Sequence, residues 1–275
     1  MSYNKKIKII ADLSSNHMGD IGLAKLMIQK AAAAGVDCVK VQSWQADKLS
    51  KSFKGDYIST YERHKKTQLS DENHFELIGW CKKNNIEFLT TCFDIDRIDF
   101  LASLGLKTIK VASSDCTSTT LLKKLMNNFE TILVSTGMTH SEEIRKTIKL
   151  LKGHDFIMLH CMSIYPTPLN QCNLNRINWL KKQGVKRVGF SDHSLGIEAT
   201  MAAMTMGIEI IEKHLTLDRT LLGKDQQMST TPDEFAKICQ WRDLCQQMLG
   251  DENPSLSEDE INLRSIYVGK WGDNE

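Results

Sequence analysis

The chain has 275 residues, of which 41% are hydrophobic and 25% charged, and its formal net charge is +1 at pH 7. This length suits one domain with a well-buried core, and the nearly neutral charge excludes the basic footprint of nucleic-acid or membrane-surface binding. The first residues lack the apolar stretch of a signal peptide, and no run approaches the ~18 apolar residues of a membrane span, so we predict a cytoplasmic protein with a small-molecule partner.

β-branched apolar runs alternate with longer helical patterns along the whole chain. The helical patterns include residues 22–34, 74–84, 141–151 and 197–206, each long enough to cross between parallel strands. The predicted strands are Lys8–Asp12, Cys38–Gln42, Phe88–Cys92, Thr108–Ala112, Ile132–Ser135, Ile157–Cys161, Val188–Ser191 and Ile210–His214. Eight such units predict an α/β fold, a (β/α)8 TIM barrel, and no G-x-G-x-x-G or P-loop fingerprint favours an open nucleotide-binding sheet.

The domain organisation follows from this alternation. No linker or low-complexity segment interrupts it, so we predict a single domain over residues 1–275, with the barrel at about 7–250 and a tail at 251–275. The eight cysteines contain no C-x-x-C pair, and several lie inside apolar strands. Reduced thiols are therefore expected, and not disulfides or a zinc site.

A long segment follows the second predicted strand. Gln45–Ser70 is rich in lysine and carries Tyr57, Tyr61, Glu62 and Arg63. It is either a lid over a substrate or a solvated loop, and its length favours a functional lid.

Polar residues crowd the C-terminal end of almost every predicted strand. In a barrel these ends meet at one rim, where barrel enzymes carry their active sites. Polar groups on eight strand ends exceed what turns require, so we predict an active site there. The residues are Asp12 to His17, Lys40, Gln42, Thr90, Thr91, Lys110, Ser113 to Asp115, Ser135, Thr136, His160, Ser163, Ser191 to His193, Lys213 and His214.

The residue types at this rim indicate two ligands. Lysines with several hydroxyl groups suit a dianionic phosphate. His193 and His214 end neighbouring strands and suit a divalent metal that polarises a carbonyl or hydroxyl. His17 is expected to be a rim group and not a ligand, and His160 is either a core or a rim histidine. Polar surroundings place the remaining histidines at the surface: His64, His74, His140 and His154.

Motifs from about residue 7 to residue 268 resemble the sialic acid synthase (N-acetylneuraminate synthase) family. The resemblance implies a transferase of sialic acid biosynthesis. Such an enzyme condenses phosphoenolpyruvate with an N-acylated hexose in open-chain aldehyde form, using Mn2+ or Mg2+, and yields a nonulosonate and phosphate. The motifs are Ile9–Asp12, Ser15–Asp20, Val39–Gln42, Phe88–Asp94, Ile109–Ser113, Leu133–Met138, Leu159–Cys161, Tyr165–Pro168, Ser191–Gly196 and Glu212–His214.

The same resemblance implies roles for single residues. His193 and His214 match the metal ligands. Asp225 matches an acidic position that contacts the sugar, and Tyr165 is expected to bind the sugar beside it. Asp12 and Asp115 stand where the family has glutamates, and we predict that they act as acid/base and water-orienting carboxylates. The positions that match those around phosphoenolpyruvate are Lys40, Gln42, Thr91, Lys110, Ser113, Ser135, Ser163 and Ser191.

Three departures from the family pattern bear on the substrate. Both aspartates are one methylene shorter than glutamate, and Lys224 and Gln226 replace a proline and a histidine near the sugar. Family members also continue beyond about Val268 into a small antifreeze-like domain that supplies an arginine to the partner's sugar site. We expect one of three arrangements: the sugar site works without that domain, a separate chain supplies the domain, or this chain is part of a longer protein. The protein could also form a homo-oligomer.

Two alternative functions remain compatible with the sequence. One is another phosphoenolpyruvate-condensing synthase, which makes an eight-carbon or seven-carbon keto-deoxy sugar acid. The other is a catalytically impaired barrel that binds a sugar acid or phosphoenolpyruvate without turnover, which the shortened carboxylates at Asp12 and Asp115 would explain.

Overall fold

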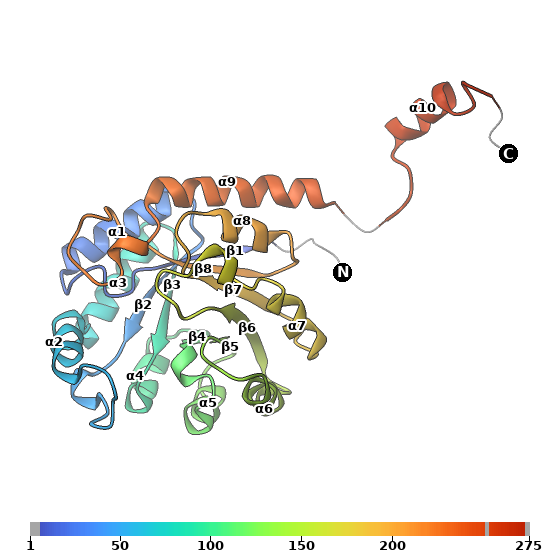
Figure 1. Ribbon diagram of the computed structural model, residues 1–275. Coiled ribbons are helices and arrows are strands. Elements are labelled where there is room, and N and C mark those ends of the chain that lie inside the picture. The colour runs from blue at the N-terminus through green and yellow to red at the C-terminus, as the bar shows by residue number, and fades with distance from the viewer. Residues whose placement is uncertain (1–5, 251–252, 273–275) are drawn as a thin grey trace.

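The computed structural model describes residues 6–250 and 253–272. Parallel strands close into a barrel in the order β1 to β8, with helices around the outside (Figure 1). The predicted (β/α)8 TIM barrel is therefore confirmed. Each strand begins and ends within two residues of the predicted positions. The strands are β1 Lys8–Asp12, β2 Cys38–Ser43, β3 Glu87–Cys92, β4 Thr108–Val111, β5 Thr131–Ser135, β6 Asp155–Cys161, β7 Val188–Asp192 and β8 Ile210–His214.

Helices join successive strands, and a long helix that follows β8 packs against the outer layer of the barrel. The helices are α1 Ile21–Ala33, α2 Tyr57–Thr67, α3 Asp71–Lys83, α4 Ile98–Ser103, α5 Thr119–Met126, α6 Ser141–Leu151, α7 Arg176–Lys182, α8 Glu198–Met204, α9 Pro232–Leu249 and α10 Glu258–Tyr267. α9 contacts α8 and α1. Residues 251–252 and 273–275 of the predicted tail lie outside the described residues.

Local sequence signals determine where several helices begin. Before α1, the Asp20 side chain accepts a hydrogen bond from the Leu23 amide, and before α3, Ser70 and Asn73 form a capping box. α9 combines a Thr231–Glu234 capping box with Pro232 at its first position. These contacts satisfy amide groups that have no partner within the helix.

The alternation of side chains along the strands divides the barrel into two environments. Residues facing outward, such as Ile9, Val39 and Ile132, pack against the helices in the main hydrophobic core. The lower half of the interior is filled by a second apolar cluster, made of Ile10, Cys38, Leu89, Leu133, Ile157, Leu159 and Ile210. Along the same strands, the inward positions nearer the C-terminal ends are polar. The barrel therefore has an apolar base beneath a polar upper end.

One buried ion pair lies outside the barrel interior, between β7, β8 and α8. Lys213 Nζ lies 2.8 Å from Asp192 Oδ2 and donates to the Ser194 carbonyl oxygen at 2.7 Å. The second donor to Asp192 Oδ2 is the hydroxyl of Thr200, at 2.7 Å. Lys213 and Asp192 belong to the predicted rim, but their side chains do not line the cavity described below. Their role is structural.

Loss of this pair is expected to destabilise the fold strongly. Lys213→Ala leaves the buried Asp192 carboxylate uncompensated, so the free energy of unfolding falls by about 3–5 kcal/mol, as urea denaturation would measure. Lys8→Ala is the matched control, because it breaks an exposed pair with Glu87 and costs at most about 1 kcal/mol. Equal losses in the two variants would contradict the structural role.

The pH dependence of stability has the sign expected for an ion-paired carboxylate. Burial works to raise the pKa of Asp192, but the charge of Lys213 and the hydrogen bonds to the carboxylate outweigh burial and lower the pKa. The unfolded chain therefore binds the proton more tightly. The stabilisation from the Asp192 carboxylate is complete above the pKa of about 3.9 that aspartate has in the unfolded chain. It is lost as the pH falls through the lower pKa that Asp192 has in the folded protein.

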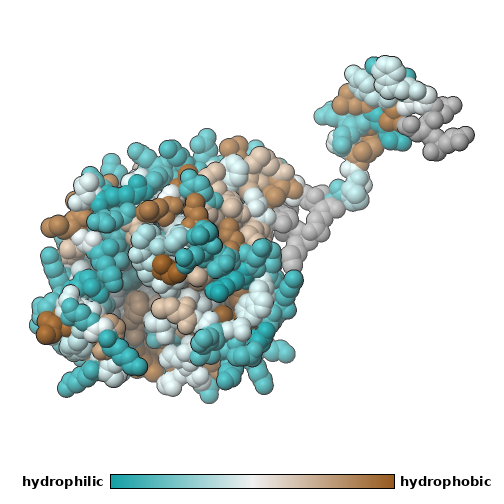
Figure 2. All heavy atoms as spheres, viewed as in Figure 1, coloured by the Kyte–Doolittle hydropathy of each residue, from teal (hydrophilic) through white to brown (hydrophobic). Residues whose placement is uncertain are grey.

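The surface and the remaining segment complete the description. Hydrophilic side chains cover much of the barrel face that Figure 2 shows. All residues from 253 to 272 are exposed. Throughout the described ranges, no helix has both the length and the apolar character needed to cross a bilayer. All eight cysteines are buried, and none of them forms a disulfide.

Candidate active site

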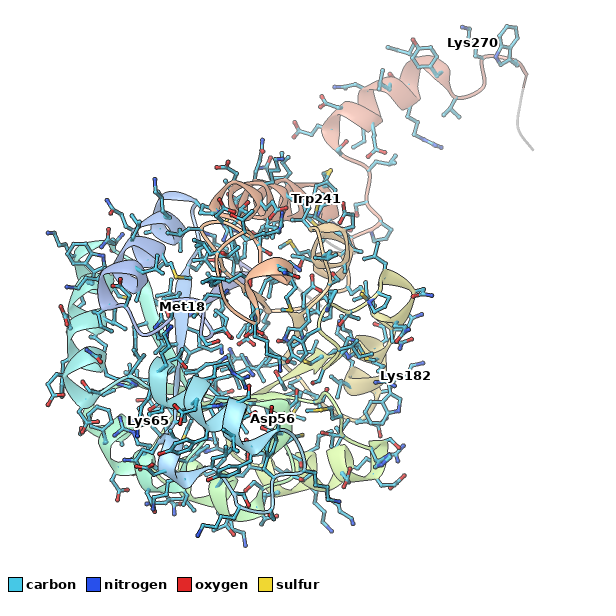
Figure 3. All side chains as sticks on the ribbon, turned by 60° about the vertical axis from the view of Figure 1, so that its left-hand side comes forward. Met18, Asp56, Lys65, Lys182, Trp241 and Lys270 are labelled. Carbon is cyan, nitrogen blue, oxygen red and sulfur yellow. The ribbon has the colours of Figure 1, made fainter. Side chains whose placement is uncertain are left out.

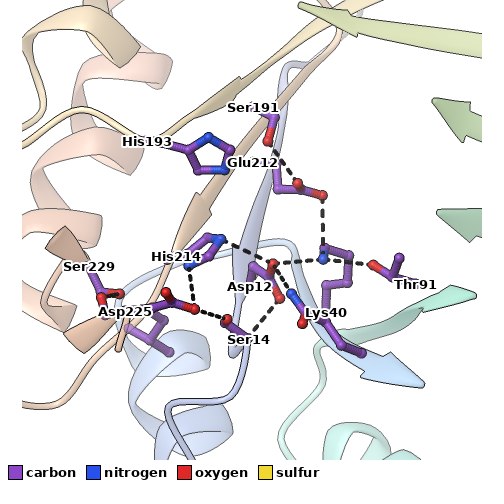
Figure 4. A network of polar contacts seen from close by, with 12 residues as sticks. Asp12, Ser14, Lys40, Thr91, Ser191, His193, Glu212, His214, Asp225 and Ser229 are labelled. Atoms are coloured by element: carbon purple, nitrogen blue, oxygen red, sulfur yellow. Dashed lines mark hydrogen bonds and ion pairs between the residues drawn. The ribbon is translucent and has the colours of Figure 1, made fainter. Parts of the chain in front are cut away.

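A polar cavity of about 290 Å³ lies at the C-terminal end of the barrel, and every strand contributes to its lining. The strand residues that line it are Asp12, Lys40, Gln42, Thr91, Lys110, Ser135, Cys161, Ser191, Glu212 and His214. Most of the strand-end residues predicted from the sequence are thus brought to one place. Figure 4 shows the network that connects several of them.

Some predicted rim residues are absent from this lining because alternate strand positions face the helices. Thr90 and Thr136 are buried without lining the cavity. The His160 Nε2 atom lies 2.7 Å from the Cys172 carbonyl oxygen, and its ring stacks on Phe190. Of the two alternatives for His160, the core histidine is therefore correct.

Two buried lysines form the positive part of the cavity floor. Lys40 Nζ lies 2.7 Å from Asp12 Oδ2 and donates to Thr91 Oγ1 at 2.9 Å. Lys110 Nζ donates to Ser135 Oγ at 2.7 Å. Burial lowers the pKa of Lys110, whereas for Lys40 the carboxylates of Asp12 and Glu212 outweigh burial and raise the pKa. Two ammonium groups held beside hydroxyls can bind a phosphate dianion.

Glu212 also belongs to this floor, although it is not among the predicted site residues. Its Oε1 accepts from Ser191 Oγ at 2.9 Å and lies 3.7 Å from Lys110 Nζ, while Oε2 lies 3.9 Å from Lys40 Nζ. Oε2 is buried and has no hydrogen-bond partner. Burial works to raise the pKa of Glu212, but Lys110 and Lys40 outweigh burial and lower the pKa. A charged carboxylate inside an apolar strand was the available signal.

The remaining predicted phosphoenolpyruvate positions line the same cavity. Gln42 Nε2 donates to Asp12 Oδ2 at 3.2 Å, and Ser113 Oγ accepts from the Gly137 amide at 3.0 Å. A Cβ atom on Gly137 would lie 2.2 Å from Ser163 Oγ and 2.9 Å from Ser113 Oγ. Glycine at this position therefore allows the two serine hydroxyls to lie against the backbone after β5.

The two predicted acid/base carboxylates occupy different environments. Asp12 is buried in the cavity, where burial works to raise its pKa but Lys40 and His214 outweigh burial and lower the pKa to about 2. Asp115 does not line the cavity, and its Oδ2 accepts a hydrogen bond from Ser114 Oγ at 2.7 Å. Burial raises the pKa of Asp115. Only Asp12 therefore contacts the lysine and histidine groups of the floor.

The two predicted metal ligands lie side by side at one edge of the cavity. The imidazole centroids of His193 and His214 are 5.3 Å apart. His193 Nδ1 lies 2.8 Å from the Met162 carbonyl oxygen, which can only accept, so in the neutral ring Nδ1 carries the proton and Nε2 keeps its lone pair. His214 Nε2 lies 3.5 Å from Asp12 Oδ2, and its buried Nδ1 has no hydrogen-bond partner.

These nitrogens fit a divalent metal ion. A neutral imidazole binds a metal through a nitrogen lone pair, and the buried Nδ1 atom of His214 has no other partner. The Met162 carbonyl oxygen contacts the other histidine, His193, in the way that contacts behind a metal site orient ligating histidines. Within residues 6–250 and 253–272, no group of three or more His, Cys, Asp or Glu side chains is placed to hold a metal. A metal bound by the two histidines would take its other ligands from substrate and water.

The predicted sugar contacts flank the histidines. The Tyr165 ring lies 4.2 Å from that of His193 and 6.2 Å from that of His214, between centroids. Asp225 Oδ2 accepts from Ser14 Oγ at 2.6 Å and lies 3.9 Å from His214 Nδ1. Both residues line the cavity, so either can contact a ligand beside the histidines.

Residues from the segment after β2 also line the cavity, through α2. Arg63, His64 and Thr67 of this helix line the cavity. The structure therefore fits the prediction that Gln45–Ser70 is a lid better than the alternative of a solvated loop. The prediction that His64 and His74 are surface groups is wrong. His64 is half-buried and packs edge-on against Trp44, while His74 is fully buried beside Phe100.

Comparison with known proteins gives one consistent result. The NeuB family model matches residues 27–254. The chain is 37% identical to the N,N'-diacetyllegionaminic acid synthase of Campylobacter jejuni, over 97% of this chain and 85% of that protein. It is 32% identical to the N-acetylneuraminate-9-phosphate synthase of Drosophila melanogaster, over 84% of this chain and 66% of that protein.

Solved structures agree with these sequence relatives. The crystal structure of the N-acetylneuraminic acid (sialic acid) synthetase from Leptospira borgpetersenii superposes with a TM-score of 0.89 at 32% identity, covering 96% of this chain and 93% of that one. The spore coat polysaccharide biosynthesis protein E from Chromobacterium violaceum gives 0.84 at 30% identity, with 95% and 82% covered. The chain therefore belongs to the NeuB family, the sialic acid synthase family that its motifs resemble, and is an enzyme of the nonulosonate synthase type.

Proposed function

We propose that this enzyme condenses phosphoenolpyruvate with the open-chain aldehyde of an N-acylated amino sugar, giving a nonulosonate and inorganic phosphate. The observation that carries the proposal is a single cavity holding Lys40 and Lys110 among hydroxyls, with His193 and His214 at its edge. The names of the relatives, which are synthases of N,N'-diacetyllegionaminic acid and of N-acetylneuraminate 9-phosphate, support the same class of product.

The lysines and hydroxyls of the floor would hold phosphoenolpyruvate. A bond forms between C3 of phosphoenolpyruvate and the aldehyde carbon, and the aldehyde oxygen takes up a proton. Water then adds at C2, and the C–O bond to phosphate breaks. Lys40 and Lys110 would stabilise the charge on the phosphate as it leaves, since fixed cations in a buried site need no reorganisation.

Asp12 is proposed to move the proton in this reaction. The Lys40 and His214 interactions outweigh burial and lower its pKa to about 2, so the carboxylate is ionised. It would accept the proton that the water loses as its oxygen bonds to C2, because that oxygen is then strongly acidic. Hydrogen bonds from Gln42 and the Ser14 amide fix its orientation. His193 and His214 would hold Mn2+ or Mg2+, which when bound polarises a carbonyl oxygen.

The proposed function is tested by phosphate release from phosphoenolpyruvate with a panel of aldoses. We expect turnover with N-acetylmannosamine or a di-N-acetylated hexose in the presence of Mn2+ or Mg2+, and its loss in chelator. Turnover only with aldoses that lack an N-acyl group would instead identify a synthase of shorter keto-deoxy acids. Phosphoenolpyruvate binding without turnover of any aldose would support a binding protein.

Replacement of Asp12 by asparagine is expected to separate catalysis from binding. Asp12→Asn removes the proton acceptor, so kcat falls by about 10²-fold or more. Phosphoenolpyruvate affinity, measured by calorimetry, is retained or increased because Lys40 loses its internal counter-charge. Asp115→Asn, outside the cavity lining, should lower kcat less. A variant of Asp12 with normal kcat would remove this residue from the mechanism.

A further inference from the structure

The loop between β8 and α9, residues 215–231, brings Asp225 to the edge of the cavity where His214 lies. Asp225 Oδ2 is 3.9 Å from His214 Nδ1 and accepts from Ser14 Oγ at 2.6 Å (Figure 4). Both contacts belong to the carboxylate, so they depend on where the loop places the backbone of this residue. The contacts that fix the loop therefore determine the position of the carboxylate.

Gln226, the next residue, uses both ends of its carboxamide to hold the loop. Its side chain has no exposed surface. The Nε2 atom donates to the Asn16 carbonyl oxygen at 3.0 Å and to the Leu222 carbonyl oxygen at 3.3 Å. The Oε1 atom is hydrogen-bonded to the hydroxyl of Thr216. One side chain thus joins the middle of the loop to its start after β8 and to the turn after β1.

Asn16, in the turn after β1, supplies a second set of contacts to the same loop. It is buried, and its Nδ2 atom donates to the Leu215 carbonyl oxygen at 2.7 Å and to Ser229 Oγ at 2.9 Å. Ser229 Oγ in turn donates to the Asp225 carbonyl oxygen at 2.6 Å. Two successive hydrogen bonds therefore connect a buried amide to the backbone of Asp225.

Close packing at Gly223 fits the loop onto these side chains. A Cβ atom on Gly223 would lie 2.9 Å from Gln226 Cγ and 3.2 Å from Met18 Sδ, and the φ angle of this glycine is +143°. Met18, which Figure 3 labels, belongs to the turn after β1. Glycine at this position therefore lets the loop lie directly against Gln226 and that turn.

Burial separates the two carboxamides and their partners from the rest of the loop. Thr216, Gln226 and Ser229 have no exposed surface, whereas Leu222 is 84% exposed. A buried polar group that loses its partner costs about 1–3 kcal/mol, so these groups hold one arrangement. Gln226, Asn16 and Ser229 do not line the cavity. Any effect that they have on a ligand must therefore pass through a residue that does.

We propose that Gln226, Asn16 and Ser229 are positioning residues, which hold the Asp225 carboxylate beside His214 and thereby help to bind the acceptor sugar. The proposal rests on the proposed function, which places the sugar aldehyde beside the histidines. A carboxylate that is already fixed loses little conformational freedom when a hydroxyl group of the sugar donates to it. Loss of these contacts should therefore weaken sugar binding and leave the phosphoenolpyruvate floor unchanged.

The kinetic test uses Gln226→Met, which keeps the length of the side chain but removes its donor and acceptor, and the milder Ser229→Ala. Phosphate release is measured with N-acetylmannosamine or the di-N-acetylated hexose that turns over. We expect the KM of the sugar to rise at least about tenfold in Gln226→Met, as for one or two lost hydrogen bonds. The KM of phosphoenolpyruvate should stay within about twofold. Gln226→His, which keeps one donor and one acceptor, should restore much of the sugar affinity.

A double-mutant cycle with Asp225→Ala separates positioning from a general loss of stability. If Gln226 acts through Asp225, Gln226→Met should raise the KM of the sugar no further once the carboxylate is gone. Thr147→Val is the matched control, because it removes a buried hydroxyl that donates to the Cys116 carbonyl oxygen at 2.8 Å, away from the cavity. It should lower the melting temperature and keep both KM values.

Crystal structures of Gln226→Met and Ser229→Ala make the test independent of turnover, and the second variant serves if the first does not fold. We expect the Asp225 carboxylate to leave Ser14, while Lys40 and Lys110 keep their contacts. If the wild type turns over no aldose but Asp225 is displaced, the proposed reaction fails and the positioning of Asp225 stands. An unmoved Asp225, additive effects in the cycle, or equal rises in the KM of both substrates would overturn the proposal.

Discussion

Alanine in place of His193 or His214 is expected to remove metal-dependent turnover while the barrel stays folded. Each substitution deletes one of two imidazoles whose centroids are 5.3 Å apart, and the remaining histidine cannot hold the ion alone. Polarisation by a bound metal is worth several kcal/mol, so the rate should fall by at least about 10³-fold. Neither side chain belongs to the hydrophobic core clusters, so folding should survive.

The measurement combines phosphate release at graded Mn2+ concentrations with thermal unfolding. His140→Asn is the matched control, because this exposed histidine precedes α6 and asparagine can preserve its capping role. We expect the control to keep both activity and metal dependence. Full activity of both alanine variants in chelated buffer would show that the aldehyde is activated without a metal on these histidines.

Methionine in place of Lys110 is the second substitution with a large expected effect. Methionine keeps much of the side-chain length but removes the charge that lies beside Ser135 in the floor. It also leaves Glu212 with one lysine instead of two, so the site changes from neutral to negative before any ligand binds. Repulsion of a phosphate dianion follows, and kcat/KM for phosphoenolpyruvate should fall by roughly 10²–10³-fold.

A change at the opposite end of the same strand provides the control. Lys107→Met removes an exposed lysine that pairs with Glu130 at the base of the barrel, away from the cavity. Steady-state kinetics with phosphoenolpyruvate as the varied substrate should separate the two variants, while circular dichroism verifies that both fold. If Lys110→Met keeps a normal KM and kcat, the phosphate cannot be bound at this end of the floor.

Much of the fold could be predicted from local patterns because β-branched runs and helical periodicity alternate so regularly. Ile210–His214 was predicted with its observed bounds, and Ser141–Leu151 likewise for the helix after β5. Such patterns do not show which of the two alternating sets of side chains on a strand faces the barrel interior. Lys213 and His214 are adjacent polar residues, yet one supports the fold and the other lines the cavity.

The candidate site was predictable where its residues sit on strand ends and unpredictable where they come from distant segments. Lys40, Lys110 and His193 could be placed because closure of the barrel brings strand ends together. Arg63 reaches the cavity only because α2 folds back beside it, and no short-range signal encodes that approach. Glu212 lies on a strand end but was not among the predicted site residues. In the motif Glu212–His214, only the histidine was given a role in the site.

The alternation along β8 has a consequence for how substitutions in this family would be read. Glu212 and His214 project into the cavity, whereas Lys213 between them joins Asp192 against the helices. In a screen that scores every substitution, changes at 212 and 214 should reduce product formation while the amount of folded protein stays normal. Changes at 213 should reduce the amount of folded protein, while the specific activity of what remains stays normal. A one-residue insertion before this strand would exchange the two sets and abolish both properties together.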